Sequence, residues 1–254
     1  MSAPKIAVLD IERQSAIADG IWQLKQSGWI NPGQIIEPAR TICFAWKWLG
    51  EPDVQFSAEW HPGGHKKMVQ KAWEVLDEAD YVVGWNSRGF DVKHLRTEFI
   101  TNGLTPPSPH KDLDLMLVAK RNFGFMSNRL SYVAQELGAG AKLANGGSDL
   151  WRTLRVGKGA ELKAAKEMME AYNKQDVVLT EEVYQIMLPW VDGLNIPIYN
   201  GTEEPACSNC GSENLHYRGV QIAATRSYRR FQCQGCGKWG REVKCESAVS
   251  SVAV

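Results

Sequence analysis

The sequence predicts an α/β domain with a mixed sheet flanked by helices, followed by a small domain that four cysteines hold together around a metal ion. Strand-like apolar runs come first, strands then alternate with helices, and the rest is mostly helical, an order typical of mixed α/β sheets. At 254 residues the chain exceeds a typical single domain. We therefore expect a main domain over residues 1–188, a proline-containing linker over 189–205 and the small domain over 206–254.

The individual elements follow from the period at which apolar residues recur along the chain. Strands are expected at residues 5–12, 41–49, 54–60 and 81–85. Helices are expected at residues 65–79, 90–101, 113–121, 130–137 and 161–186. Two segments lack a clear period. Residues 13–40 are expected to be an insertion that covers the site, and residues 138–159, rich in glycine and basic residues, a mobile loop.

The formal net charge of the chain is zero, but it is unevenly distributed. Residues 205–254 carry seven Lys and Arg against three acidic residues, a charge of +4, and the remainder carries 22 against 26, a charge of −4. A basic appendage on an acidic body suits a polyanionic partner. No apolar run approaches the roughly 20 residues that span a membrane, and no export signal is recognisable. We therefore expect a cytoplasmic protein without membrane contact, in the host cytoplasm if the chain is of phage origin.

Two carboxylates end the first apolar run, Lys5–Glu12, where Asp10 and Glu12 are separated by a single isoleucine. Side chains alternate between the faces of a strand, so these two carboxylates should point the same way. Like charges at this spacing repel each other unless a cation lies between them. The alternative is a strand end with two solvated acids.

Two further acidic elements lie downstream. Asp91 follows a predicted strand and opens a helix, so it could face the crevice at the carboxyl ends of the strands or simply complement the helix dipole. Tyr172 and Asp176 are four residues apart in a predicted helix and share one face of it. Asp176 borders an apolar stripe and would need a partner there, such as a metal ion, whereas the alternative is a surface Tyr-Asp pair.

Together these elements resemble the motifs of the DEDD superfamily of 3′ to 5′ exonucleases, which have the ribonuclease-H-like fold. The first motif, Asp-x-Glu, matches Asp10 and Glu12, and the second, Asn-x-x-x-Phe-Asp, matches Asn86, Phe90 and Asp91. The third, Tyr-x-x-x-Asp, matches Tyr172 and Asp176 and indicates the tyrosine branch. The resemblance covers about residues 5–188. The wording of its last motif is similar to that in exonuclease domains of phage and bacterial proteins and of family B polymerases. The long 13–40 segment departs from the pattern.

This resemblance implies hydrolysis of phosphodiester bonds with two Mg²⁺ or Mn²⁺ ions, hard cations that prefer carboxylate ligands. By the same resemblance Asp10 bridges both ions, Glu12 and Asp176 complete the first site, and Asp91 holds the second. Tyr172 would orient the attacking water. Asp114 would be a carboxylate that supports these ligands without contacting a metal ion. The alternative is an ordinary acid at the start of a helix.

The cysteine spacing is the clearest signal in the small domain. Two Cys-x2-Cys pairs are separated by 22 residues, and four thiolates suit a closed structural zinc site, here formed by Cys207, Cys210, Cys233 and Cys236. The segment resembles a zinc ribbon. It contains too little apolar surface to fold alone, so one zinc ion should be needed for folding.

Basic and aromatic residues are interleaved between and after the cysteine pairs, which suits phosphate contacts and stacking on unpaired bases. The expected contacts with nucleic acid are Arg218, Arg226, Arg229, Arg230 and Lys238, together with Asn86 and Phe90 of the main domain. The alternative for this surface is docking to a protein.

The sequence therefore predicts a metal-dependent 3′ to 5′ exonuclease acting on DNA or RNA. Its expected partners are single-stranded DNA or a 3′ end, and a replication or recombination protein. Two alternatives stay open: a structure-specific endonuclease on the same fold, and a catalytically silent module that binds nucleic acid.

Overall fold

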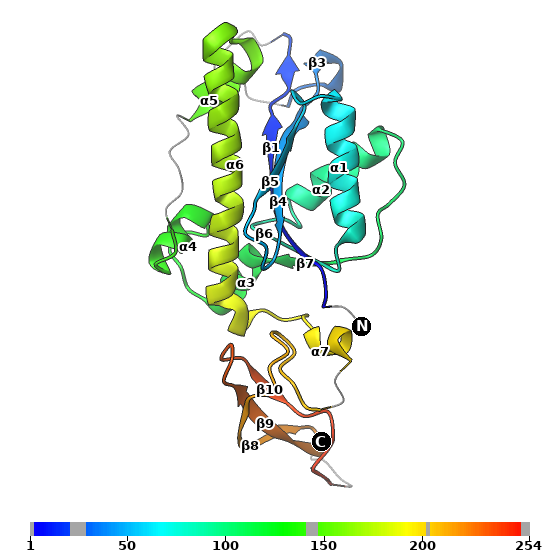
Figure 1. The fold of residues 1–254 in the computed structure, drawn as a ribbon, viewed down its shortest axis with the longest axis vertical. Coiled ribbons are helices and arrows are strands. Elements are labelled where there is room, and N and C mark those ends of the chain that lie inside the picture. Colours follow the sequence, from blue (N-terminus) through cyan, green and yellow to red (C-terminus); the bar gives the residue numbers. More distant parts are fainter. Residues whose placement is uncertain (1–2, 21–28, 141–146, 202–203, 250–254) are drawn as a thin grey trace.

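The computed structural model describes residues 3–20, 29–140, 147–201 and 204–249 of the chain, and its core is a five-stranded mixed sheet (Figure 1). The strand order is β5-β4-β1-β6-β7. The strands are β1 (Ile6–Gln14), β4 (Arg40–Trp48), β5 (Gln55–Ala58), β6 (Tyr81–Gly84) and β7 (Lys111–Asp114). β1, β4 and β5 pair antiparallel, whereas β1, β6 and β7 run parallel. The predicted mixed sheet is confirmed.

Helices cover both faces of this sheet, as Figure 1 shows. They are α1 (Gly64–Glu78), α2 (Asp91–Thr101), α3 (Leu115–Asn122), α4 (Leu130–Glu136), α5 (Ser148–Val156) and α6 (Gly159–Met187). Leu9 and Ile11 of β1 are buried against α1 and α2, whereas Ile6 and Val8 are buried against α6. This alternation follows from the two-residue period of a strand and directs the even positions of β1 toward α6.

Two elements differ from the sequence-based expectation. Leu113 and Asp114 were expected to open the helix over 113–121, but they belong to β7, which pairs in parallel with β6 along the full length of both strands. Ser148–Val156 was expected in a mobile loop, but it forms α5, whose Leu150 is buried in a cluster with Met169 and Tyr172. Both elements are stabilised by tertiary contacts that a local apolar period does not reveal. Residues 141–146 of the expected loop lie outside the described residues.

The segment expected to be an insertion over the site is partly extended. β1 continues to Gln14, and the short strands β2 (Ile17–Ala18) and β3 (Ile35–Glu37) pair with each other, with a 3-10 helix at Pro32–Gln34 between them. Residues 21–28 lie outside the described residues.

The C-terminal part is a small antiparallel sheet of four strands. Its strands are β8 (Leu215–Ala223), β9 (Arg226–Cys233), β10 (Trp239–Arg241) and β11 (Ser247–Ala248). A 3-10 helix (Leu188–Trp190) and α7 (Ile196–Asn200) lie between α6 and this sheet. The division into residues 1–188, 189–205 and 206–254 stays a prediction.

Side-chain contacts fix the small sheet to the end of α6. The buried amide of Asn209 donates to the carbonyls of Leu188 (2.6 Å) and Val191 (2.7 Å), which follow the helix. The ammonium of Lys238 donates to the Val191 carbonyl (2.9 Å) and to Asp192 (2.7 Å). Backbone carbonyls at and after the helix end are thereby satisfied by two residues of the C-terminal part that lie outside its strands. Among the described residues, none of the helices is both long and apolar enough to cross a membrane.

A polar cluster joins β4, the residue that follows β5, α1 and α2. His65 lies between Glu59 (3.7 Å) and Glu98 (3.1 Å), and these two carboxylates raise the pKa of His65 to about 9. Glu59 also pairs with Arg40 at 2.8 and 2.9 Å, and Glu98 accepts the backbone amide of Thr41 at 2.7 Å. The cluster therefore connects four segments of the chain through one imidazole.

This geometry predicts a pH dependence of stability. The pKa of His65 in the folded protein is above that of an unfolded histidine, so its contribution is complete below about pH 6.5 and is lost as the pH rises toward 9. We expect a loss of about 1–3 kcal/mol in the free energy of unfolding over this range, measured by urea denaturation. In the His65→Gln variant, the free energy of unfolding should not fall in this way as the pH rises. Equal slopes in variant and wild type would contradict the prediction.

Candidate nuclease site and cysteine cluster

Three carboxylates from β1 and α6 meet at the centre of the main domain. One carboxylate oxygen from each of Asp10, Glu12 and Asp176 lies within 4.8 Å of the others. The first two share the face of β1 that is turned toward α6, and Asp176 is only 3% exposed. Clustered carboxylate oxygens are the donor set that divalent cations such as Mg²⁺ or Mn²⁺ prefer, so the group fits such an ion.

Asn173 is a buried residue of this site that the sequence reasoning missed. Its amide on α6 donates to Asp10 Oδ2 (2.7 Å) and to the Asp10 backbone carbonyl (3.2 Å). It precedes Asp176 by three positions, so both side chains lie on the same face of α6. That spacing is the signal that could have identified it. The amide fixes the orientation of Asp10 and compensates part of its negative charge.

Asp91 lies next to this group but is not one of the three clustered residues. It is the first residue of α2, 2% exposed, and its Oδ1 accepts the backbone amide of Ile11 at 3.0 Å. β1 pairs with β6 only as far as Val8. Beyond Val8, the carboxylate of Asp91 accepts a backbone amide of β1, that of Ile11. Burial, with Asp114 and Asp176 nearby, raises the pKa of Asp91 to about 7 despite the backbone hydrogen bonds that lower it.

Asp114 organises the loop that leads to Asp91. Its carboxylate caps α3, accepting the amides of Met116 (3.0 Å) and Leu117 (3.3 Å). The same carboxylate accepts the amides of Asn86 (3.0 Å) and Arg88 (3.2 Å). The residue is thus a helix-start acid, and it also supports the loop before Asp91. Its predicted support of metal-binding carboxylates stays a prediction.

Asn86 and Phe90 lie in this loop between β6 and α2. Asn86 has a φ of 63°, a left-handed conformation that asparagine tolerates better than most residues. Phe90 is 39% exposed, and its ring meets His94 edge-on at 4.8 Å between centroids. An exposed aromatic ring near buried carboxylates is compatible with the predicted contact with a base.

Tyr172 is held by α5, the helix that the sequence did not predict. It is 6% exposed, and its ring meets Trp151 edge-on, with centroids 6.2 Å apart and an interplanar angle of 81°. Tyr172 lies one helical turn before Asp176 on α6. The structure therefore packs the ring of Tyr172 against α5.

The four predicted cysteines form the second cluster. The sulfur atoms of Cys207, Cys210, Cys233 and Cys236 all lie within 4.8 Å of one another, with two pairs at 3.5 Å. Four thiolates around a tetrahedral zinc ion are about 3.8 Å apart, whereas a disulfide needs about 2.0 Å. All four are free thiols here. The arrangement fits a zinc ion.

One face of the small sheet combines arginines and aromatic rings. Arg230 and Arg241 are directly opposite each other on β9 and β10, and so share a face. Arg218 (5.7 Å) and Arg230 (5.0 Å) lie over the ring of Trp239, which is 42% exposed, and Arg241 lies over Tyr228 (3.9 Å). We call Arg218, Arg226, Tyr228, Arg230, Trp239 and Arg241 the Trp239 face.

Two predicted nucleic-acid contacts have other neighbours. Arg229 points to the opposite face, over the ring of Tyr217 (4.0 Å) and 3.7 Å from Glu242. Lys238 is only 16% exposed and is paired with Asp192. Both side chains stabilise the small sheet or its attachment, so their part in binding stays a prediction with less support than for the Trp239 face.

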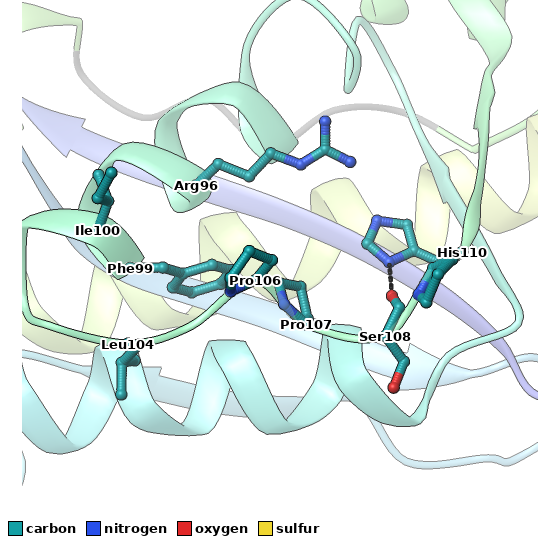
Figure 2. Close-up of a pocket in the computed structure, with 9 residues that line it drawn as sticks. Arg96, Phe99, Ile100, Leu104, Pro106, Pro107, Ser108 and His110 are labelled. Atoms are coloured by element: carbon teal, nitrogen blue, oxygen red, sulfur yellow. Dashed lines mark hydrogen bonds between the residues drawn. The ribbon is translucent and has the colours of Figure 1, made fainter.

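An apolar groove lies apart from both clusters (Figure 2). It has a volume of about 470 Å³ between the end of α2 and the proline-rich loop, with Phe99, Ile100, Pro106 and Pro107 in its lining. No sequence-predicted site residue lines this groove. It therefore contributes nothing to the carboxylate site.

Comparisons with known proteins agree with this architecture. A model of the RNase H superfamily matches residues 44–188, which include Asp91, Tyr172 and Asp176 but not β1. No match is found among curated proteins. Among solved structures, the chain is similar to the family B DNA polymerase from the hyperthermophilic archaeon Pyrobaculum calidifontis, with a TM-score of 0.53 and 16% identity. The alignment covers 74% of this chain and 25% of the polymerase, and it shows a shared fold.

Asp176→Asn should change the response of the protein to manganese. Without metal we expect a melting temperature about 2–4 °C higher than wild type, because one of three repelling charges is removed. Adding Mn²⁺ should raise the melting temperature of the wild type but hardly that of the variant. Differential scanning calorimetry in EDTA and in Mn²⁺ measures both effects. Glu167→Gln, which changes an exposed acid on the same helix, is the control and should behave as wild type. A full manganese response in Asp176→Asn would contradict the assignment.

Proposed function

The chain belongs to the RNase H superfamily, and from this premise we propose that it is a metal-dependent 3′ to 5′ exonuclease that hydrolyses phosphodiester bonds of DNA or RNA. The observation that carries the proposal is the group of Asp10, Glu12 and Asp176, whose carboxylate oxygens lie within 4.8 Å of one another. Clustered like charges repel one another, so a fold that gathers them favours a bound cation.

The residues present suit Mg²⁺ or Mn²⁺. Asp10, Glu12 and Asp176 would hold one ion, and Asp91, adjacent to Ile11 of β1, would contribute with Asp10 to a second. When bound, such ions polarise the phosphodiester and make water a better nucleophile near neutral pH. Asn173 keeps Asp10 in its orientation, and Asp114 keeps the loop before Asp91 in place.

Tyr172 is proposed to position the attacking water. A tyrosine phenol is ordinarily protonated at neutral pH, so it donates or accepts a hydrogen bond and does not remove the proton. The edge-on contact with Trp151 limits rotation of the ring. A fixed hydroxyl one turn from Asp176 can thus orient a water molecule toward the carboxylate group.

The direction of hydrolysis rests on the motif order. Asp10-x-Glu12, Asn86 to Asp91 and Tyr172 to Asp176 follow one another as in the tyrosine branch of DEDD exonucleases. An endonuclease on the same fold remains the second candidate.

The C-terminal sheet is proposed to be a zinc ribbon that holds nucleic acid on the Trp239 face. Four cysteines with sulfur atoms 3.5–4.8 Å apart suit structural zinc. The face offers arginines for phosphates and rings for bases, which suits single-stranded DNA or a 3′ end. A replication or recombination protein is a further proposed partner, and the cytoplasm the proposed location.

Substitution of the carboxylates should separate catalysis from folding. We expect Asp10→Asn and Asp176→Asn each to lower the rate by about a thousandfold or more, because several kcal/mol of transition-state stabilisation is lost. Tyr172→Phe should lose less, about a hundredfold or below, since only the positioning of water is affected. Single-turnover release of nucleotides from a 3′-labelled oligonucleotide measures these rates. Near-normal turnover in a correctly folded Asp10→Asn variant would refute the assignment.

The same assay distinguishes the two candidate activities. An exonuclease releases the 3′ label at once as a mononucleotide and leaves circular single-stranded DNA intact. Internal fragments, or cleavage of the circle, would favour the endonuclease.

The Trp239 face should supply much of the salt-dependent affinity. Each phosphate contact that is lost lowers the slope of log affinity against log salt by about 0.7 for single strands, so Arg230→Ala with Arg241→Ala should reduce it by about 1.4. Fluorescence anisotropy of a labelled oligonucleotide measures the slope. Arg229→Ala, on the opposite face, is the matched control and should change it less. Equal slopes in the double variant and the wild type would favour a protein-docking role.

A further inference from the structure

A basic cavity adjoins the carboxylate group on the side of α5. It has a volume of about 350 Å³, and its lining includes Arg13 and Gln14 of β1 and Trp151, Arg152 and Arg155 of α5. Figure 1 shows α5 beside the first turns of α6, toward the end of the molecule where β2 and β3 lie. We propose that this cavity binds a backbone phosphate of the substrate strand outside the bond that is cleaved, an inference that rests on the proposed nuclease function.

The position of the cavity connects it to the carboxylates through two elements. Arg13 and Gln14 directly follow Glu12 on β1, and the register of β1 against β4 shifts between Glu12 and Arg13. Such a bulge redirects the side chains that follow it. On the other wall, Trp151 contacts the ring of Tyr172. A strand held at the carboxylates would therefore pass this cavity.

The arginines of the cavity have no carboxylate partner within the described residues. Within the described part of the chain, Arg13, Arg152 and Arg155 form no ion pair with a carboxylate, whereas Arg40 and Arg121 are paired with Glu59 and Asp192. Unpaired guanidinium groups gathered in a concave surface favour an anionic ligand, and the guanidinium fork matches phosphate oxygens.

Arg13 and Arg155 are held in place by neutral partners. Arg13 contacts Nε2 of His94 and the Ala39 carbonyl, both at 3.1 Å, while its buried Nε has no hydrogen-bond partner among the described residues. Burial lowers the pKa of Arg13, and Glu98 offsets this only in part. Arg155 donates to the Ser15 carbonyl. These contacts orient the guanidinium groups without removing their charge.

A polyanionic substrate needs positive charge beside the three carboxylates. A polyanion that approaches Asp10, Glu12 and Asp176 is repelled by their charges, and positive charge beside them compensates this repulsion. Arg152 is the exposed arginine of the cavity, and no hydrogen bond ties it to the backbone within the described residues. It is therefore the residue whose removal tests the cavity without disturbing β1.

The first experiment measures binding without metal. In EDTA, Arg152→Ala should bind a single-stranded oligonucleotide about three- to tenfold more weakly than wild type, with a salt slope lower by about 0.7, whereas Arg152→Lys should keep most of the slope. Lys120→Ala removes one exposed charge from α3, near the other end of α6 in Figure 1, and should behave as wild type. Affinity and slope in Arg152→Ala equal to those of Lys120→Ala would overturn the proposal.

The second experiment identifies which phosphate is bound. With Mn²⁺, Arg152→Ala should raise the KM for a long oligonucleotide while kcat is little changed, and it should leave a dinucleotide unaffected because that substrate has no phosphate beyond the bond that is cleaved. An equal effect on both substrates would overturn the assignment to the strand and indicate the reacting phosphate or the released nucleotide.

The two proposals can fail separately. If the wild type hydrolyses no substrate but Arg152→Ala still binds more weakly, the nuclease function is wrong and the phosphate site is supported. If hydrolysis depends on Asp10 while Arg152→Ala binds as wild type, the nuclease function stands and the phosphate site is wrong.

Discussion

Repulsion among the carboxylates of Asp10, Glu12 and Asp176 is the constraint that the rest of the main domain has to withstand. Three carboxylate oxygens within 4.8 Å would separate if either supporting element could move. β1 cannot move easily, because it is paired with β4 on one side and β6 on the other. α6 spans 29 residues and buries its apolar side chains against the same face of the sheet. Asn173 then joins the two elements directly.

The acidic residues in and around the carboxylate group differ in the hydrogen-bond donors that they accept, and this difference distinguishes their roles. Asp114 accepts four backbone amides, which stabilise its charge and fix the loop before α2. Asp91 accepts the amide of Ile11 yet lies in a setting that raises its pKa. Among the clustered carboxylates, Asp10 accepts the side-chain amide of Asn173. Asp114 thus organises the backbone, whereas the carboxylate of Asp10 has an oxygen in the group that fits a cation.

α6 also connects the carboxylate group to the C-terminal sheet. Asn173 and Asp176 lie in its middle, and the carbonyls that follow its end are bound by Asn209 and Lys238. The small sheet is thus attached by hydrogen bonds as well as by the chain itself. Basic surfaces occur at two places in the chain, in the cavity beside α5 and on the Trp239 face. Both are built from arginine with aromatic neighbours, which suits one polyanionic strand.

The sequence by itself determined the mixed sheet, most helices, the pairing of Asp10 with Glu12 on one face, and the four-cysteine group, because strand alternation, helical period and the Cys-x2-Cys spacing are local patterns. Only the tertiary structure decided the rest. β7 exists because β6 pairs with it, and α5 packs on α6 through Leu150. Asn173 shares a helix face with Asp176, but its contact with Asp10 exists only because α6 lies against β1. Lys238 reads as one more basic residue in sequence, and Asp192, 46 residues away, pairs with it only in the folded chain. Contacts between distant segments carry no local period, and they decide which side chains the carboxylate site and the small sheet use.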